Sequence, residues 1–268
     1  MAQTWDPGQY LKFAGPRLRP ALDLMAQVHP RQSPSTVVDL GCGVGNVTRL
    51  LGERWPAAAI EGVDGSAEML AKARAEAADI DWHEAADIGW HEADLTTWSP
   101  ARPVDVLYSN AALHWLDDHA ELFPRLAGML AVGGVLAVQK PRNHGAPSHT
   151  CMTEAAAPWQ DILEPVLRPS PVAAPEVYYD FLAPHIGELE IWESVYMHVL
   201  DGDNPVVEWT KGTALKPLLD VLDEGAGEGA TRAEFLADYG ARIRAAYPPR
   251  TDGRTLFPFR RLFIVAVR

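Results

Sequence analysis

The chain has 268 residues, of which 47% are hydrophobic and 22% charged, a composition typical of a globular enzyme that folds without disulfides or metals. Its formal net charge of −13 argues against a nucleic-acid substrate, because phosphate backbones are repelled at long range. Cys42 and Cys151 lack the spacing of a disulfide framework or a thiolate metal site, and no signal peptide or membrane span is evident. We therefore expect a cytoplasmic protein with a small-molecule substrate and no membrane, metal or nucleic-acid partner.

Strand and helix patterns alternate along the first half of the chain. In order, they predict a helix over residues 19–29, a strand over 36–40, a helix over 46–55, a strand over 59–63, a helix over 66–77 with Ser66 as its N-cap, a strand over 104–108, an amphipathic helix over 119–130 and a strand over 134–138. Such alternation predicts a doubly wound α/β fold, with a mostly parallel sheet and helices on both faces.

Beyond Pro141 the texture of the sequence changes. Prolines become frequent between short helix patterns, which predicts a helical lid, and strand character returns at 188–200 and 261–267 around a helical insert. We expect one domain throughout residues 1–268. Its predicted parts are an N-terminal arm and helix (1–35), a cofactor-binding core (36–140), helical lid and substrate insertions (141–187 and 203–247) and antiparallel closing strands (188–202 and 258–268).

A tandem near-duplication occupies residues 78–93, where Ala-Asp-Ile-x-Trp-His-Glu-Ala occurs twice. We interpret it as a local duplication that lengthens a surface loop. The alternative is a metal site built from His83, Glu84, His91 and Glu92, but nothing in the sequence fixes the geometry of these side chains.

The glycine-rich turn at residues 39–45 carries the first chemical signal. Asp39 ends a predicted strand, and the glycines allow a ligand to approach the backbone before the start of a helix. Asp64, about twenty residues later, ends the next strand, where a carboxylate can accept hydrogen bonds from both hydroxyls of a ribose. These features fit an adenosylmethionine site and a dinucleotide site alike.

Two further features favour S-adenosylmethionine. The glycines follow the spacing G-x-G-x-G rather than G-x-G-x-x-G, and Asp39 brings a negative charge that suits an ammonium group better than a pyrophosphate. A third strand ends near Asp94, where a carboxylate can accept from the adenine amino group. Asp87 in the first copy of the duplication is the rival, and we prefer Asp94 because it leads directly to the next strand. The expected cofactor-binding residues are Asp39, Gly41, Cys42, Gly43, Asp64, Gly65, Ser66, Met69, Asp94, Leu95, Asn110 and Ala111.

The sequence closely resembles the trans-aconitate 2-methyltransferases over nearly its whole length. The resembling segments are residues 5–13, 17–20, 39–43, 109–116, 121–124, 134–139, 178–180, 215–217 and 261–266, together with Trp209. The segment at 5–13, the Tyr178-Tyr179 pair and the last strand are the most specific, since the glycine and acid motifs are common to a superfamily. The resemblance implies a Rossmann-like, seven-stranded sheet with an antiparallel last strand and a helical lid.

It also implies transfer of a methyl group from S-adenosylmethionine to a carboxylate of a small polycarboxylic acid, most simply trans-aconitate. A carboxylate is ionised at neutral pH, so alignment matters more than a general base, although His114 is a possible base or donor. Arginines suit carboxylates, and the cations available near the resembling segments are Arg17, Arg19, Lys140, Arg142, Lys216, Arg260 and Arg261. The expected substrate-binding residues are Tyr10, Arg17, His114, Trp115, Arg142, Tyr178, Tyr179 and Arg260.

Three alternatives stay open at the level of sequence. The first is a methyltransferase for another small acid, a hydroxyl or an amine. The others are an NAD-dependent oxidoreductase and a cofactor-binding protein without catalysis. The sequence does not predict an oligomeric state, and a monomer is compatible with it.

Overall fold

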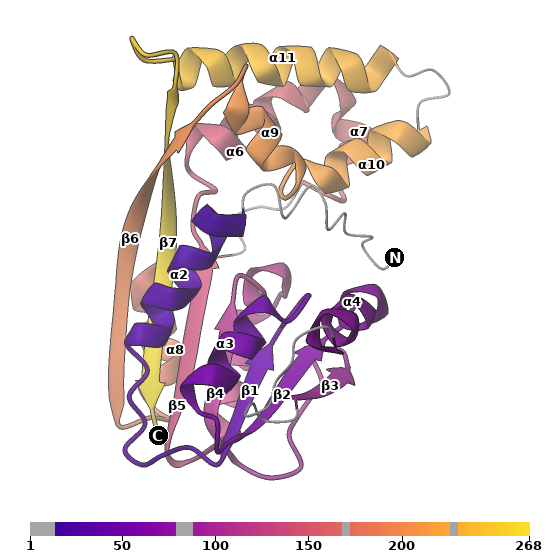
Figure 1. Ribbon diagram of the computed structural model, residues 1–268. Coiled ribbons are helices and arrows are strands. Elements are labelled where there is room, and N and C mark those ends of the chain that lie inside the picture. The colour runs from indigo at the N-terminus through magenta and orange to yellow at the C-terminus, as the bar shows by residue number, and fades with distance from the viewer. Residues whose placement is uncertain (1–13, 79–87, 168–171, 226–229) are drawn as a thin grey trace. The chain divides into compact units, whose positions relative to one another are not determined.

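A computed structural model of the protein describes residues 14–78, 88–167, 172–225 and 230–268. Its helices are α2 (Ala14–Ala26), α3 (Asn46–Arg54), α4 (Ala67–Ala78), α5 (His119–Gly128), α6 (Pro147–Ala155), α7 (Gln160–Leu163), α8 (Pro175–Leu182), α9 (Pro205–Lys211), α10 (Lys216–Gly225) and α11 (Ala230–Ala246). Two short 3₁₀ turns are η1 (Leu113–Trp115) and η2 (Ala157–Trp159). The strands are β1 (Thr36–Leu40), β2 (Ala59–Asp64), β3 (Ile88–Glu92), β4 (Val104–Asn110), β5 (Leu130–Pro141), β6 (Glu188–Leu200) and β7 (Thr255–Val267) (Figure 1).

The seven strands form one sheet in the order β3-β2-β1-β4-β5-β7-β6. β1 pairs in parallel with β2 on one side and with β4 on the other, and the pairs β2–β3 and β4–β5 are parallel as well. β7 runs antiparallel to β5, because Gly133 and Gly134 bond with Arg268 whereas Arg142 bonds with Arg260. The expected doubly wound, mostly parallel sheet with an antiparallel closing strand is confirmed.

The order of elements in the first half agrees with the periodicities, but several boundaries differ. α2 begins at Ala14 rather than at residue 19, α5 ends at Gly128 rather than at 130, and β5 and β7 begin earlier than expected, at Leu130 and Thr255. Apolar runs before a strand fit a helix or a strand equally well, so pairing in the sheet decides where the strand begins. β3 lies in the second copy of the duplication, as expected for a third strand that ends near Asp94, so this copy does not lengthen a loop.

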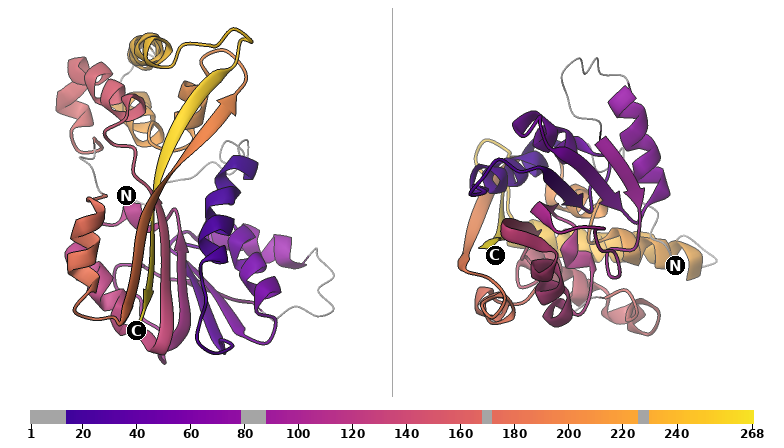
Figure 2. Two further views of the ribbon diagram at one scale, coloured as in Figure 1. Left: turned by 90° about the vertical axis from the view of Figure 1, so that its left-hand side faces the viewer. Right: turned by 90° about the horizontal axis from the view of Figure 1, so that it is seen from below.

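Two compact units divide the chain. Of the described residues, one unit consists of 18–78, 88–141, 172–194 and 262–268, and the other of 14–17, 142–167, 195–225 and 230–261. In the first, which we call the sheet unit, α3 and α4 cover one face of the sheet and α5 and α8 the other (Figure 2). Its core holds buried residues of β1, β4, β5, α5 and α8, including Leu107, Phe123 and Tyr178.

The second unit, which we call the helical unit, has a core of its own. Trp209, Phe235, Tyr239 and Phe257 are all but fully buried, and they cluster with aliphatic residues of α6, α9, α10 and α11. Part of the predicted lid, residues 172–187, groups with the sheet unit instead, since α8 packs against α5. Among the described residues, no helix is long and apolar enough to span a membrane, and no group of three or more metal-ligating side chains occurs.

Candidate functional site

The glycine turn between β1 and α3 is shaped by close contacts that leave no room for a side chain at two of its glycines. Gly41 has φ +74°, and a Cβ there would lie 2.1 Å from Ala112 Cβ. A Cβ on Gly45, with φ +75°, would lie 2.3 Å from the Trp90 ring. At Gly43, also in the left-handed region, a Cβ would meet nothing within 4 Å. The turn therefore contacts protein at Gly41 and Gly45 and leaves space beside Gly43.

Asp64 fastens this turn to the end of β2. Its Oδ2 accepts a hydrogen bond from the Gly43 amide at 2.8 Å, and its Oδ1 accepts one from the Ser66 amide at 2.9 Å. The Ser66 hydroxyl accepts from the Met69 amide at 3.3 Å, which confirms Ser66 as the N-cap of α4. A carboxylate offers about four acceptor positions, so two remain for hydroxyl groups of a ligand.

Asp39 lies at the same edge but is buried. Its Oδ2 accepts from the Thr48 hydroxyl of α3 at 2.6 Å. Burial raises the pKa of the Asp39 carboxyl to about 7, the Thr48 hydrogen bond opposes that shift, and the charge of Asp64 adds to it. Cys42 is buried beside these acids, and burial together with their charges raises the pKa of its thiol, so the thiol is inert.

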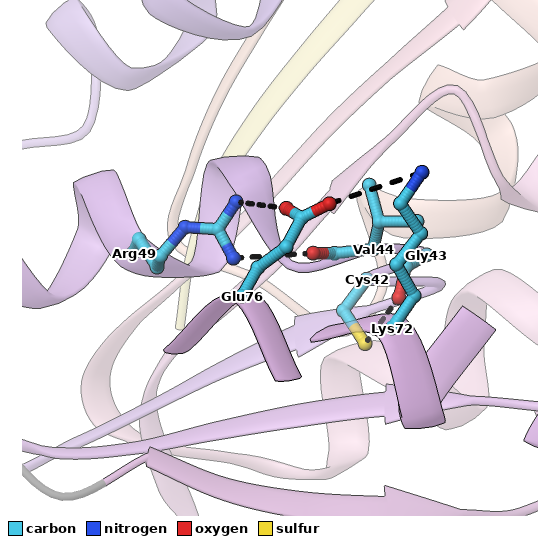
Figure 3. Close-up of polar contacts among 6 residues, drawn as sticks. All are labelled: Cys42, Gly43, Val44, Arg49, Lys72 and Glu76. Carbon is cyan, nitrogen blue, oxygen red and sulfur yellow. Dashed lines mark hydrogen bonds and ion pairs between the residues drawn. The ribbon is translucent and has the colours of Figure 1, made fainter. Parts of the chain in front are cut away.

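An ion-paired arginine of α3 holds the turn from outside (Figure 3). Arg49 donates from Nη1 to the Val44 carbonyl oxygen at 3.2 Å and from Nη2 to Glu76 of α4 at 3.1 Å. Lys72 lies 3.8 Å from the same carboxylate. The guanidinium thus joins the turn and both helices that follow the two acid-bearing strands.

The ends of β3 and β4 complete this edge of the sheet. The expected register of the third strand is confirmed, because β3 ends at Glu92, level with Asp64, and Asp94 follows it. Asp94 is exposed, and its Oδ1 accepts from the Thr96 hydroxyl and amide, which hold the pKa of the Asp94 carboxyl below its usual value. The rival Asp87 lies outside the described residues.

The buried Oδ1 atom of the half-buried Asn110 gives a test of whether this edge fits a cofactor. Within the described parts of the chain its Oδ1 has no hydrogen-bond partner, which is costly for a buried acceptor unless a ligand supplies a donor. Ala111 follows with φ +53°, unusual for a residue other than glycine. An unmatched acceptor, open space at Gly43 and two carboxylates fit a ligand with a cationic end and hydroxyl groups.

The expected acid-binding residues of the sheet unit fall into different environments. His114 and Trp115 lie on η1 and are partly exposed, with ring centroids 4.8 Å apart. Tyr178 is fully buried in the core of the sheet unit, whereas Tyr179 is 57% exposed. The two side chains project in different directions from α8, because successive residues of a helix are turned by about 100°.

Arg142 and Arg260 lie opposite each other in the helical unit. The Arg142 amide donates to the Arg260 carbonyl oxygen at 3.0 Å. The Asn143 side chain donates to the same oxygen at 2.9 Å and accepts from the Arg260 amide at 2.8 Å, so it continues the strand pairing beyond Pro141. Residues directly opposite in an antiparallel pair project to the same face. Tyr10 and the side chain of Arg17 lie outside the described residues.

Comparison with known proteins identifies the family. Residues 37–134 match the family model described as a methyltransferase domain. A trans-aconitate 2-methyltransferase of Azoarcus sp. is 50% identical over 265 residues, which cover 99% of each chain. One of Streptomyces coelicolor is 46% identical over 269 residues, covering 99% of this chain and 87% of that one. The chain belongs to the trans-aconitate 2-methyltransferase family.

Solved structures show the same fold at low identity. YcgJ of Bacillus subtilis matches with a TM-score of 0.58 at 14% identity, covering 93% of this chain and 98% of that one. Phosphoethanolamine N-methyltransferase 2 of Haemonchus contortus, solved in complex with S-adenosylhomocysteine, matches with a TM-score of 0.58 at 15% identity, covering 97% of this chain and 56% of that one. At this identity the likeness concerns the fold alone.

In this trans-aconitate 2-methyltransferase family member, the sequence analysis did not identify three residues of the sheet unit that make supporting contacts. Trp90 packs against Gly45 and Gly62, Arg49 holds the Val44 carbonyl, and His119 bonds with Tyr178. No local motif marks Arg49 or His119, because their partners are distant in the sequence or are backbone atoms. For Trp90 the sequence held one signal, because Trp90 lies in the second copy of the duplication, which forms β3.

Proposed function

We propose that this protein transfers the methyl group of S-adenosylmethionine to a carboxylate of trans-aconitate and so forms a monomethyl ester. The observation that supports it best is the 50% identity over 99% of the chain with a relative of that name. The acids and glycines at the edge of the sheet support the choice of cofactor. A small-molecule substrate also agrees with the net charge of −13, which disfavours nucleic acid.

The cofactor-binding role of the edge residues follows from their chemistry. Asp64 keeps acceptor positions for the ribose hydroxyls, and Asp39, next to the turn, suits the ammonium group of the cofactor. Asp94 can accept from the adenine amino group with the oxygen that Thr96 leaves unused. Gly41, Cys42, Gly43, Gly65, Ser66, Met69, Leu95, Asn110 and Ala111 complete the proposed cofactor site.

When bound, S-adenosylmethionine supplies an electrophilic methyl group on a sulfonium. The acceptor carboxylate is already ionised at neutral pH, so the chain does not need to remove a proton from it. What the residues contribute is binding, orientation and exclusion of water. His114 can hold the acceptor with a hydrogen bond, and it would act as a base only for a less acidic acceptor such as a hydroxyl.

The non-reacting carboxylates need cations, and we propose Arg142 and Arg260 for them. Their guanidinium groups start from opposite positions of one strand pair, which suits an acid with more than one carboxylate. Tyr10, Arg17, Trp115 and Tyr179 remain proposed contacts of the acid. Tyr178 does not, since its buried hydroxyl already bonds with His119 and with the Ala173 amide.

A labelled-methyl assay tests this function. The purified enzyme is incubated with methyl-labelled cofactor and, separately, with trans-aconitate, fumarate and crotonate, and ester formation is followed by mass spectrometry. Fumarate and crotonate differ by one carboxylate on the same carbon skeleton. We expect trans-aconitate to have the highest kcat/KM. No ester with any acid, despite tight binding of S-adenosylhomocysteine, would mean another acceptor.

Arg142→Gln and Arg260→Gln refine the substrate assignment. Each should raise the KM for trans-aconitate about tenfold and leave the affinity for S-adenosylhomocysteine unchanged, because a hydrogen-bonded charge pair contributes about 1.5–3 kcal/mol. Arg244→Gln, which removes an exposed ion pair with Asp203 in the same unit, is the control. Wild-type kinetics in both variants would remove the two arginines from the acid site.

A further inference from the structure

A buried chain of hydrogen bonds leads from α8 to the η1 turn. The Tyr178 hydroxyl oxygen lies 2.8 Å from His119 Nδ1, and His119 Nε2 lies 2.9 Å from the Leu113 carbonyl oxygen. Because a carbonyl oxygen only accepts, Nε2 carries the hydrogen. In the neutral ring Nδ1 is then the acceptor, and the Tyr178 hydroxyl donates to it. The chain therefore has one direction, from hydroxyl to imidazole to carbonyl.

Surrounding contacts hold Tyr178 in this orientation. Its hydroxyl accepts a hydrogen bond from the Ala173 amide at 3.1 Å, and its ring lies 4.8 Å, centroid to centroid, from that of Phe123. Lys140, fully buried near the end of β5, places its Nζ 3.5 Å from the Tyr178 ring centroid and 4.2 Å from that of Phe123. The Tyr178 hydroxyl has two hydrogen-bond partners and the residue is 0% exposed, so a structural role suits it better than contact with a substrate.

The Leu113 end of this hydrogen-bond chain acts on η1, the turn that carries two proposed contacts of the acid. The Leu113 carbonyl oxygen also accepts from the Leu116 amide, so His119 adds a second bond to the carbonyl that closes η1. His114 and Trp115 are the next two residues along this turn. Ala112, the residue before Leu113, packs closely against Gly41 of the glycine turn, since a Cβ on Gly41 would lie 2.1 Å from the Ala112 Cβ.

We propose that Tyr178 and His119 are positioning residues, which set the orientation of η1 and so of His114 toward the acid, without touching substrate or cofactor. The proposal rests on the function proposed above for the orientation of the acid. Without the Tyr178 hydroxyl, His119 Nδ1 is a buried acceptor that has lost its donor. Ring rotation or a change of tautomer would relieve it, and either movement gives up the bond to Leu113.

Phenylalanine variants test the chain, with a matched tyrosine as control. Tyr178→Phe keeps the ring contacts and removes the hydroxyl, and His119→Phe removes the middle of the chain. Each should lower kcat/KM for trans-aconitate about tenfold, and the double variant should be no worse than either single variant, because both break one chain. The affinity for S-adenosylhomocysteine should stay at the wild-type value. His119→Gln, which can still donate to Leu113 and accept from Tyr178, should recover part of the loss.

Tyr108→Phe is the control for a merely structural hydroxyl. Tyr108 is as buried as Tyr178, and its hydroxyl donates to the Ala21 carbonyl oxygen at 2.6 Å, away from η1. This variant should lower Tm to a similar degree and leave the kinetics unchanged. If Tyr178→Phe behaves like Tyr108→Phe, or if the losses in the double variant simply add, the proposal is wrong.

Hydrogen exchange keeps this test separate from the assignment of the substrate. Amide exchange in the peptide over residues 113–118 should become faster in Tyr178→Phe and stay unchanged in Tyr108→Phe, with no substrate present. If the wild-type enzyme does not methylate trans-aconitate, the proposed function fails while this measurement still decides whether the chain holds η1. Unchanged exchange in both variants would overturn the proposal whatever the substrate.

Discussion

The glycine turn of the sheet unit and the core of the helical unit stabilise the protein in different ways. Around the turn, backbone atoms do most of the work, since amides of Gly41 and Cys42 bond with Val63 and the amide of Gly43 bonds with Asp64. In the helical unit, large side chains such as Trp209 and Phe257 are buried against one another. A change of one methyl group should therefore be critical in the first region and tolerable in the second.

The largest expected effect comes from a methyl group added to the turn. In Gly41→Ala the new Cβ would overlap Ala112, and a non-glycine residue in left-handed backbone costs about 1–3 kcal/mol in addition. Affinity for S-adenosylhomocysteine, measured by calorimetry, should fall at least about 100-fold. Gly240→Ala in α11 is the counterpart in the helical unit, and it should leave this affinity unchanged. Equal effects at Gly41 and Gly240 would contradict the contrast between the regions.

Removal of the carboxylate that ties the turn to β2 should come next. Asp64→Ala loses an acceptor for two backbone amides and, on our proposal, for two ribose hydroxyls, so cofactor affinity should fall about ten- to 100-fold. Asp94→Ala should lose less, since that carboxylate is exposed. Calorimetry with both variants gives the ranking, and wild-type affinity in a folded Asp64→Ala would remove Asp64 from the cofactor site.

The Asp39 carboxyl beside the glycine turn should make cofactor affinity depend on pH. With a pKa of about 7, its carboxyl becomes neutral below that pH, and a neutral group attracts an ammonium less well. Wild-type affinity for S-adenosylhomocysteine should therefore fall as the pH drops from 8 to 6, and Asp39→Asn should be weaker at pH 8 and nearly independent of pH. A pH dependence retained in Asp39→Asn would assign it to another group.

The same shift predicts an opposite effect on stability. A carboxyl whose pKa is raised in the folded state binds its proton more tightly there, so the ligand-free fold loses stability as the pH rises from about 4 to about 7. At pH 8, Asp39→Asn should thus melt above the wild-type protein without ligand. A lower Tm of Asp39→Asn than of the wild-type protein at pH 8 would show that interactions of the charged Asp39 carboxylate offset the cost of its burial.

The smallest expected effect concerns the arginine outside the turn. Arg49→Gln removes the bonds to Val44 and Glu76, and affinity for S-adenosylhomocysteine should fall roughly three- to tenfold, since partly exposed ion pairs contribute little. Arg54→Gln on the same helix removes a charge that bonds with the Val28 carbonyl instead, and it should bind as the wild-type protein does. Equal losses would indicate a general effect of charge rather than support of the turn.

Much of the sheet unit was predictable because its signals are local. Asp39, the glycines and Asp64 lie within 26 residues, and the ends of parallel strands meet at one edge by topology alone. The strand at 36–40 and the N-cap at Ser66 were correct to the residue, and Asp94 was correctly placed after the third strand. The start of β5 was missed because it depends on pairing with β4 rather than on its own pattern.

The sequence by itself determined the fold class, the family and the acids at the edge of the sheet, because short motifs fix backbone geometry and charge. Only the tertiary structure decided which of two adjacent tyrosines is buried, that Lys140 lies against Tyr178 and Phe123, and that Arg142 and Arg260 are opposite each other. These facts depend on segments between 17 and 118 residues apart. Packing sets the rotation of a helix about its axis and the register of distant strands, and neither can be predicted from the type of a single residue.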